Sequence, residues 1–300
     1  MRRRIISTAL LFTTFLSLCS CGSAVTKSSD PSGSTHSDPI NSQDQQTSED
    51  VSADTFLPKD KEYSILFIGN SFTFYNDMPA SLFAPICKEA GYNVKVDSIT
   101  SGGYFLHQFA SLGDKYGKEV DRLLHETKYD YVILQEQSGN AVSSPSSFFG
   151  GVRSLARKIK ASGCENIILF ETWGYKKGYH LLPTHGGDTA TMEEKMRASY
   201  TAIAEETDSE VALVGVAFRD IYENTDINLY DSDLYHPSEK GSMLAAYTIF
   251  SKIFNYDVRD MTFRKRISKD EMKLLKAAAY NAVFEDHPVD DEYKINSKAE

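Results

Sequence analysis

The chain has 300 residues, a length that suits one folded domain of about 200 to 250 residues with extensions. Its composition is that of a globular protein, with 41% apolar and 25% charged residues. The formal net charge of −10 argues against a nucleic acid as the partner, because binding to phosphates needs a basic surface.

The first twenty residues have the pattern of a bacterial signal peptide. Three arginines at positions 2–4 precede the mostly apolar run Ile5–Leu18, which is too short for a comfortable transmembrane helix. The run ends in Leu-Cys-Ser-Cys, which resembles a lipobox with Cys21 as the lipidated residue. Cys19 fits this motif poorly, and an ordinary cleavage nearby is the alternative. We therefore expect a signal peptide over 1–20 and a lipid-anchored, extracytoplasmic protein that touches the membrane only through this lipid.

The next segment is rich in Ser, Thr, Asp, Gln and Pro and has almost no apolar residues. Such a composition cannot bury enough apolar surface to offset the entropy of ordering the chain. We expect a disordered tether over 21–60, a folded domain over 61–255 and a helical extension packed on that domain over 256–300.

Short apolar runs rich in β-branched residues alternate with longer amphipathic segments along the domain. The predicted strands are Tyr63–Ile68, Val94–Ile99, Tyr131–Leu134, Ile167–Phe170 and Val211–Val216. The predicted helices are Pro79–Ala90, Lys115–Glu126, Phe148–Ala161, Met192–Glu206, Glu239–Phe254 and Lys269–Phe284. This alternation predicts an α/β fold with a mostly parallel five-stranded sheet, whose ligands bind at the carboxyl ends of the strands.

Small and polar residues follow the first two predicted strands. Gly69-Asn70-Ser71 comes after the first, where Gly69 permits a tight turn and Ser71 is a candidate nucleophile. A serine or asparagine in this place also serves as an ordinary helix cap. Gly102 and Gly103 follow the second strand, where they form either a plain turn or a backbone approach to an oxyanion.

The third strand is followed by Gln135-Glu136-Gln137 and, shortly after, by Asn140. An amide N–H at the edge of the sheet can donate to a developing oxyanion. Hydrogen bonding between neighbouring loops is an equally good interpretation of each of these residues.

Asp233 and His236 lie near the end of the domain in the segment Asp-Leu-Tyr-His-Pro. Histidine is the usual general base near neutral pH, and an aspartate three residues earlier can accept its Nδ1–H and orient the ring. A surface histidine at the start of a helix is the alternative.

Taken together, these motifs resemble the SGNH (GDSL-like) hydrolase superfamily, which has a flavodoxin-like three-layer α/β/α sandwich fold. The resemblance covers roughly residues 62–255 and rests on Gly-Asn-Ser (69–71), the glycines at 102 and 103, and Asp-x-x-His-Pro (233–237). The family's third block, Gly-x-Asn-Asp, is absent, and Leu-Gln-Glu-Gln-Ser (134–138) stands in its place. That segment looks like a subgroup of secreted bacterial proteins.

The resemblance implies a serine esterase with the catalytic residues Ser71, Asp233 and His236. The implied oxyanion donors are the N–H groups of Ser71 and Gly103 and the Gln137 amide, with Gly102 and Asn140 as alternatives. No metal and no organic cofactor are implied. His180 and His185 are five residues apart, which is not a convincing metal-binding pair.

Other residues near the predicted site are candidates for substrate binding, namely Asn70, Glu136 and Trp173. Trp173 follows the fourth strand and opens a long loop over about 172–190; it either meets a sugar ring or packs this loop onto the domain. Cys87 and Cys164 are expected to be buried free thiols, although their pairing is not decided by the sequence.

An exterior esterase with such a site suggests acyl groups on carbohydrate as the substrate, and the resemblance implies acetyl above all. A lipase- or thioesterase-type acylesterase and an acyltransferase are alternatives on the same catalytic residues. A non-catalytic glycan-binding lipoprotein is the alternative from another class. The sequence leaves the sugar, the acyl group and the oligomeric state open.

Overall fold

The computed structural model describes residues 57–299. The predicted signal peptide over 1–20, the lipidated Cys21 and most of the tether over 21–60 lie outside these residues and stay predictions. Among residues 57–299, no helix combines the length and the apolar character needed to cross a bilayer.

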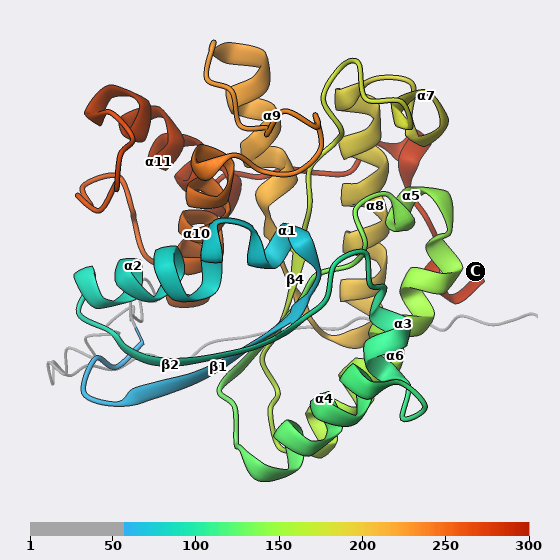
Figure 1. Cartoon of the computed structure of the whole chain (residues 1–300). Coiled ribbons are helices and arrows are strands. Elements are labelled where there is room, and N and C mark those ends of the chain that lie inside the picture. Colours follow the sequence, from blue (N-terminus) through green and yellow to red (C-terminus); the bar gives the residue numbers. More distant parts are fainter. Residues whose placement is uncertain (1–56, 300) are drawn as a thin grey trace, which may run out of the picture. The chain divides into compact units, whose positions relative to one another are not determined.

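Five parallel strands form one sheet in the order β2-β1-β3-β4-β5 (Figure 1). The strands are β1 (Glu62–Gly69), β2 (Asn93–Thr100), β3 (Tyr131–Leu134), β4 (Ile167–Glu171) and β5 (Glu210–Leu213). This is the strand order of flavodoxin-like sheets. The prediction of an α/β fold with a parallel five-stranded sheet is therefore confirmed.

The central strands β1, β3 and β4 are buried on both faces, which explains why they are mostly apolar runs, whereas the edge strand β2 is largely exposed or half-buried. In β1, Ile65 and Phe67 lie in one hydrophobic core, whereas Leu66 and Ile68 lie in the other. The two cysteines are free and buried, with Cys87 in the first core and Cys164 in the second. Because the sheet separates these cores, the thiols do not pair.

Helices cover each face of the sheet and complete three layers (Figure 1). One layer contains a π-helical turn η2 (Met78–Phe83), α2 (Ala84–Glu89), α9 (Val214–Asn224), α10 (Glu239–Phe254) and α11 (Lys269–Phe284). The other contains α3 (Leu106–Ala110), α4 (Lys115–Glu126), α6 (Pro145–Ala161) and α8 (Thr189–Thr207). Short helices are α1 (Ser71–Phe74), η1 (Tyr75–Asp77), α5 (Asn140–Ser143), α7 (Leu182–His185), η3 (Asp291–Tyr293) and η4 (Ser297–Ala299).

The end of the fifth strand differs from its prediction. The strand was expected to run to Val216, but it ends at Leu213, and helix α9 begins at Val214. Leu213 is the last residue that pairs with β4, and the N–H of Gly215 donates to the buried carboxylate of Glu171 at 3.0 Å. The carbonyl oxygen of Thr172 lies 2.4 Å from where a Cβ of Gly215 would be, so only glycine allows this close approach.

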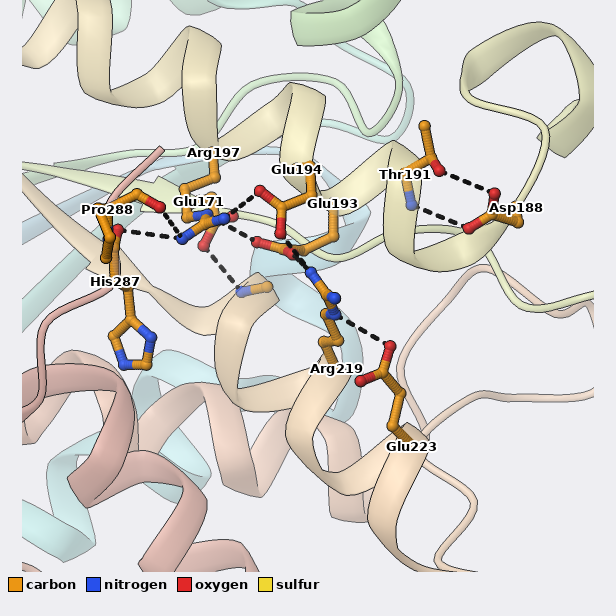
Figure 2. A network of polar contacts seen from close by, with 11 residues as sticks. Glu171, Asp188, Thr191, Glu193, Glu194, Arg197, Arg219, Glu223, His287 and Pro288 are labelled. Atoms are coloured by element: carbon orange, nitrogen blue, oxygen red, sulfur yellow. Dashed lines mark hydrogen bonds and ion pairs between the residues drawn. The ribbon is translucent and has the colours of Figure 1, made fainter. Parts of the chain in front are cut away.

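A network of charged side chains, buried at Glu193 and Arg197, joins α8, α9 and the segment after α11 (Figure 2). Arg197 donates to the carbonyl oxygens of His287 and Pro288 at 3.0 and 2.9 Å and pairs with Glu193 and Glu194. Arg219 pairs with the same two carboxylates from α9. The network therefore ties the C-terminal segment to the domain.

Glu171 lies beside this network and has an unusual ionisation. Burial, together with the neighbouring Glu193 carboxylate, raises the pKa of Glu171 well above its ordinary value. The carboxyl is therefore held as the neutral acid more readily than an exposed glutamate.

Candidate active site

The candidate site lies at the carboxyl ends of β1, β2 and β3. The loop after β1 leads to Ser71, the loop after β2 contains Gly102 and Gly103, and the loop after β3 contains Gln137. β1 is hydrogen-bonded to β2 on one side and to β3 on the other, so the chain order reverses at β1. A sheet of this kind binds ligands in the crevice at such a reversal.

The turn that presents Ser71 is fixed by the side chain of Gln135. The Oε1 atom of Gln135 accepts the N–H of Asn70 at 2.8 Å and the hydroxyl of Thr73 at 2.9 Å. It would lie only 2.7 Å from a Cβ at Gly69, so the turn requires glycine there. Asn70 then caps α1, since its side chain accepts the N–H of Phe72 at 3.2 Å. Ser71 begins the helix with its hydroxyl free to face the histidine.

Ser71, His236 and Asp233 are hydrogen-bonded in series. The Nε2 atom of His236 lies 2.8 Å from the hydroxyl oxygen of Ser71, and its Nδ1 atom lies 2.6 Å from Oδ2 of Asp233. An aspartate at Nδ1 favours the tautomer whose Nε2 accepts the serine proton. Segments separated by 165 residues in sequence thus supply the two ends of one proton path.

Asp233 is held in its ionised form. Partial burial opposes its charge, but hydrogen bonds from the His236 ring and from the N–H groups of His236 and Tyr235 outweigh this effect and lower the pKa of Asp233. Its Oδ1 atom accepts these two backbone N–H groups at 3.0 and 3.2 Å. The carboxylate can therefore stabilise an imidazolium at His236.

A cavity of about 420 Å³ lies over these residues. It is lined by Asn70, Ser71, Phe72, Phe74, Tyr75, Gly102, Gly103, Gln137, Ser138, Tyr235 and His236. Gly103 has a φ of +70°, which favours glycine, and nothing lies within 4 Å of where a Cβ would be. The backbone at this position is therefore open to a bound molecule.

The structure separates the two amides that were alternatives for the oxyanion. Gln137 is half-buried, lines the cavity and donates from Nε2 to the hydroxyl of Ser138 at 3.1 Å. Asn140 is buried at the start of α5 and does not line this cavity. Of the two, only Gln137 lines the cavity that contains Ser71.

The expectation that Trp173 binds substrate is wrong. Its side chain is fully buried and stacks between Phe72 and Phe218, with ring centroids 4.6 and 4.0 Å away. Its Nε1–H donates to the carbonyl oxygen of Tyr235 at 3.0 Å. Trp173 therefore packs its loop onto the domain core and holds the histidine segment through the hydrogen bond to Tyr235.

Asn70 and Glu136 are also used by the fold. Asn70 lines the cavity, but its Nδ2 donates to the carbonyl oxygen of Tyr104 at 3.0 Å, and its Oδ1 caps α1. Glu136 is only 1% exposed and accepts the N–H groups of Gln137 and Leu106 at 2.6 and 3.3 Å. The prediction that Glu136 contacts substrate is wrong, because its carboxylate is buried between the two loops.

Burial gives Glu136 a pH-dependent effect on stability. Desolvation raises its pKa to about 7, although the two backbone N–H groups partly oppose the shift. The folded protein thus binds a proton more tightly than the unfolded chain does. The contribution of Glu136 to the free energy of unfolding is largest below its unfolded pKa of 4.5 and is lost as the pH rises towards 7.

We expect Glu136→Gln to remove this dependence. Between pH 5 and pH 8 the wild type should lose about 2 to 3 kcal/mol of unfolding free energy that the variant does not lose. The difference in stability between variant and wild type should therefore shift in favour of the variant by that amount. Urea unfolding at the two pH values measures the difference. Glu165→Gln, at an exposed position, is the control and should show no comparable change. An equal effect of Glu136→Gln at both pH values would contradict the assignment.

Aromatic side chains around the histidine were not predicted. The ring of Tyr75 stacks on that of His236 with centroids 4.1 Å apart and planes 6° apart, and the Tyr235 ring lies at 3.9 Å. Phe74 is 39% exposed at the rim of the cavity. The sequence does contain aromatic residues shortly after Ser71 and directly before His236. Their orientation towards the histidine ring depends on the tertiary fold and could not be predicted.

Among residues 57–299, no group of three or more His, Cys, Asp or Glu side chains is arranged to hold a metal ion. His180 lies in the loop before α7, and His185 is the last residue of that helix. The His185 ring packs against Tyr175 at 5.5 Å, and its Nδ1 lies 2.9 Å from the carbonyl oxygen of Leu181.

This chain is similar to several solved structures. No protein-family model and no curated protein matches the sequence. A solved structure assigned to the SGNH hydrolases, from Slackia heliotrinireducens, is similar with 27% identity and a TM-score of 0.56, over 64% of this chain and 100% of that one. A DUF4886 family protein from Bacteroides uniformis has 17% identity and a TM-score of 0.66, over 75% of this chain and 96% of the other.

A third similar structure, from Parabacteroides merdae, is assigned as a GDSL-like lipase. Its identity is 15% and its TM-score 0.50, over 65% of this chain and 96% of that protein. The sheet order and these similarities define an SGNH-type hydrolase fold. The chain is therefore similar to the SGNH hydrolases in fold and, at 27% identity, similar in sequence to one structure assigned to them. Membership of a subgroup with the Leu-Gln-Glu-Gln-Ser block stays a prediction.

Proposed function

We propose that this protein is an extracytoplasmic serine esterase that removes acetyl or other short acyl groups from carbohydrate. The observation that carries the proposal is the series of hydrogen bonds from Ser71 to His236 at 2.8 Å and from His236 to Asp233 at 2.6 Å. Nucleophile, base and orienting carboxylate need such contacts for acyl transfer.

In the proposed reaction, the Ser71 hydroxyl attacks the ester carbonyl while Nε2 of His236 takes its proton. The N–H groups of Ser71 and Gly103 and the amide of Gln137 donate to the oxyanion of the tetrahedral intermediate. His236 then returns the proton to the leaving alcohol, which leaves an acyl group on Ser71. Water, activated by His236, hydrolyses this acyl-enzyme and restores the serine.

Two features support a carbohydrate ester as the substrate. The cavity volume of about 420 Å³ lies at the small end of the range for ligand sites. Its wall combines aromatic rings at Phe74, Tyr75 and Tyr235 with glycines and the polar side chains of Gln137 and Ser138. Aromatic faces beside hydrogen-bonding groups suit a sugar ring better than a long alkyl chain.

The test is acetate release from a panel of acetylated glycans, compared with hydrolysis of p-nitrophenyl acetate and p-nitrophenyl octanoate. We expect activity on at least one glycan and on the acetate ester, and much weaker activity on the octanoate. Ser71→Ala is the blank. A preference for octanoate would indicate a lipase-type acylesterase, and hydrolysis lost on adding an acceptor sugar would indicate an acyltransferase. No release above the blank, with glycan binding retained, would indicate a binding lipoprotein.

The proposed location rests on residues 1–21, which lie outside the described part of the chain. Lipidation at Cys21 would attach the domain to the exterior of the bacterial membrane through the segment before residue 61. Cys21→Ala should move the protein from the membrane fraction to the soluble fraction, whereas Cys19→Ala should leave it in the membrane fraction. The same fractionation for both variants would argue against this anchor.

A further inference from the structure

The segment after the proposed nucleophile has an unusual backbone. Asn76 and Asp77 are consecutive non-glycine residues in the left-handed region, with φ values of 56° and 51°. Each such residue is disfavoured by about 1 kcal/mol, although Asn and Asp tolerate it better than most. Paired positions of this kind persist only where the surrounding structure holds them, and they concentrate at functional sites.

This backbone conformation brings the Asn76 side chain onto the histidine segment. Its Nδ2 donates to the carbonyl oxygen of Pro237 at 3.2 Å and to the hydroxyl oxygen of Ser242 at 2.8 Å. The Ser242 hydroxyl in turn lies 3.4 Å from the carbonyl oxygen of Tyr75. One amide therefore bridges the loop that carries Ser71 and the segment that carries His236, which are far apart in sequence.

The same bridge sets the position of Tyr75 against the imidazole. Asp233 accepts a hydrogen bond in the plane of the His236 ring, which fixes where Nε2 points but not the tilt of the ring. Tyr75 packs flat on that ring, with planes 6° apart, and so fixes the tilt. A flat aromatic face also stabilises the positive charge that the imidazole gains when it takes the serine proton.

From this arrangement we infer that Asn76 is a positioning residue that locks the histidine segment onto the nucleophile loop and keeps Tyr75 stacked on His236. The inference rests on the proposed serine-esterase function and concerns the same site. Asn76 is itself exposed. Its hydrogen bonds therefore align the two segments but add little to the stability of the hydrophobic core.

Asn76→Gly tests the inference, because glycine keeps the left-handed backbone and removes only the amide. With p-nitrophenyl acetate, kcat should fall about 10- to 100-fold and KM should change less than about twofold, as expected for misalignment of a base without loss of binding. Asp77→Gly is the matched control, since its carboxylate accepts only from Ser81 within the described residues and leaves the histidine segment untouched. Equal kcat values for the two variants would overturn the inference.

Two further measurements keep the outcome decisive. Ser242→Ala removes one of the two acceptors of the Asn76 amide, so this variant should lower kcat less than Asn76→Gly does. In the double variant, Ser242→Ala should lower kcat little further than Asn76→Gly alone. The proton NMR signal of the hydrogen bond between His236 and Asp233 should broaden in Asn76→Gly but not in Asp77→Gly. If the wild type hydrolyses no ester, the proposed function fails, and this signal still decides whether Asn76 positions the ring.

Discussion

Ser71→Ala should lower kcat/KM for p-nitrophenyl acetate by about 10⁴- to 10⁶-fold while leaving the fold intact. The hydroxyl oxygen of Ser71 lies 2.8 Å from Nε2 of His236, and the turn around it is held by Gln135, Asn70 and Thr73. Removing the hydroxyl therefore removes the nucleophile without removing a support of the loop. Steady-state rates and thermal unfolding of both proteins measure the two parts of the prediction.

Asp233→Asn extends this test to the other end of the hydrogen-bonded series. An asparagine amide at this position donates to Nδ1, which selects the tautomer whose Nε2 carries the proton and cannot accept one from Ser71. We expect a loss of about 10⁴-fold in kcat. If either variant kept more than a tenth of the wild-type rate, the hydrolysis would belong to other residues, and the catalytic assignment would have to be abandoned.

Arg197→Met should destabilise the protein by about 3 to 5 kcal/mol, the largest effect on stability that we expect from a single substitution. The arginine is buried and compensates the carboxylates of Glu193 and Glu194 (Figure 2). Methionine fills a similar volume but leaves these buried charges with Arg219 alone and releases the carbonyl oxygens of His287 and Pro288. The free energy of unfolding in urea measures the loss.

Arg122→Met provides the matched control. Arg122 also pairs with two glutamates on a helix, but its side chain is 47% exposed, so the expected loss is at most about 1 kcal/mol. A loss of this small size for Arg197→Met would mean that the network contributes little to stability. In that case the C-terminal segment would be held by apolar contacts instead.

The central strands were predictable because β1, β3 and β4 are buried on both faces and read as mostly apolar runs, whereas the edge strand β2 is predictable from its alternating valines and the position of its neighbours. The apolar run that continues past Leu213 belongs to helix α9 and not to the strand. Val214, Ala217, Phe218 and Ile221 are buried on one side of α9, and a buried helix has apolar runs that imitate a strand. The spacing of these four positions is helical, but the run Val211–Val216 is not distinguishable from a strand by composition.

The site was predicted through its chemistry and only partly through its geometry. A hydroxyl, an imidazole and amides following different strands had to meet at one edge of a parallel sheet, and the structure brings Ser71, His236 and Gln137 together there. The orientation of Trp173 and Glu136 was not predictable, because it depends on packing between loops. β3 ends at Leu134, so alternation along the strand did not reveal that Gln135 turns beneath the nucleophile.

The long separation between Ser71 and His236 in sequence has a consequence for the newly made chain. A ribosome completes the nucleophile turn and its strands long before it adds the histidine segment, whose Pro237 and Ser242 must then contact Asn76. A shortened polypeptide that lacks this segment carries the Ser71 hydroxyl without the histidine that would activate it. Esterase turnover would therefore report that the histidine segment has docked onto the nucleophile loop, so one colorimetric assay would follow this late step of folding.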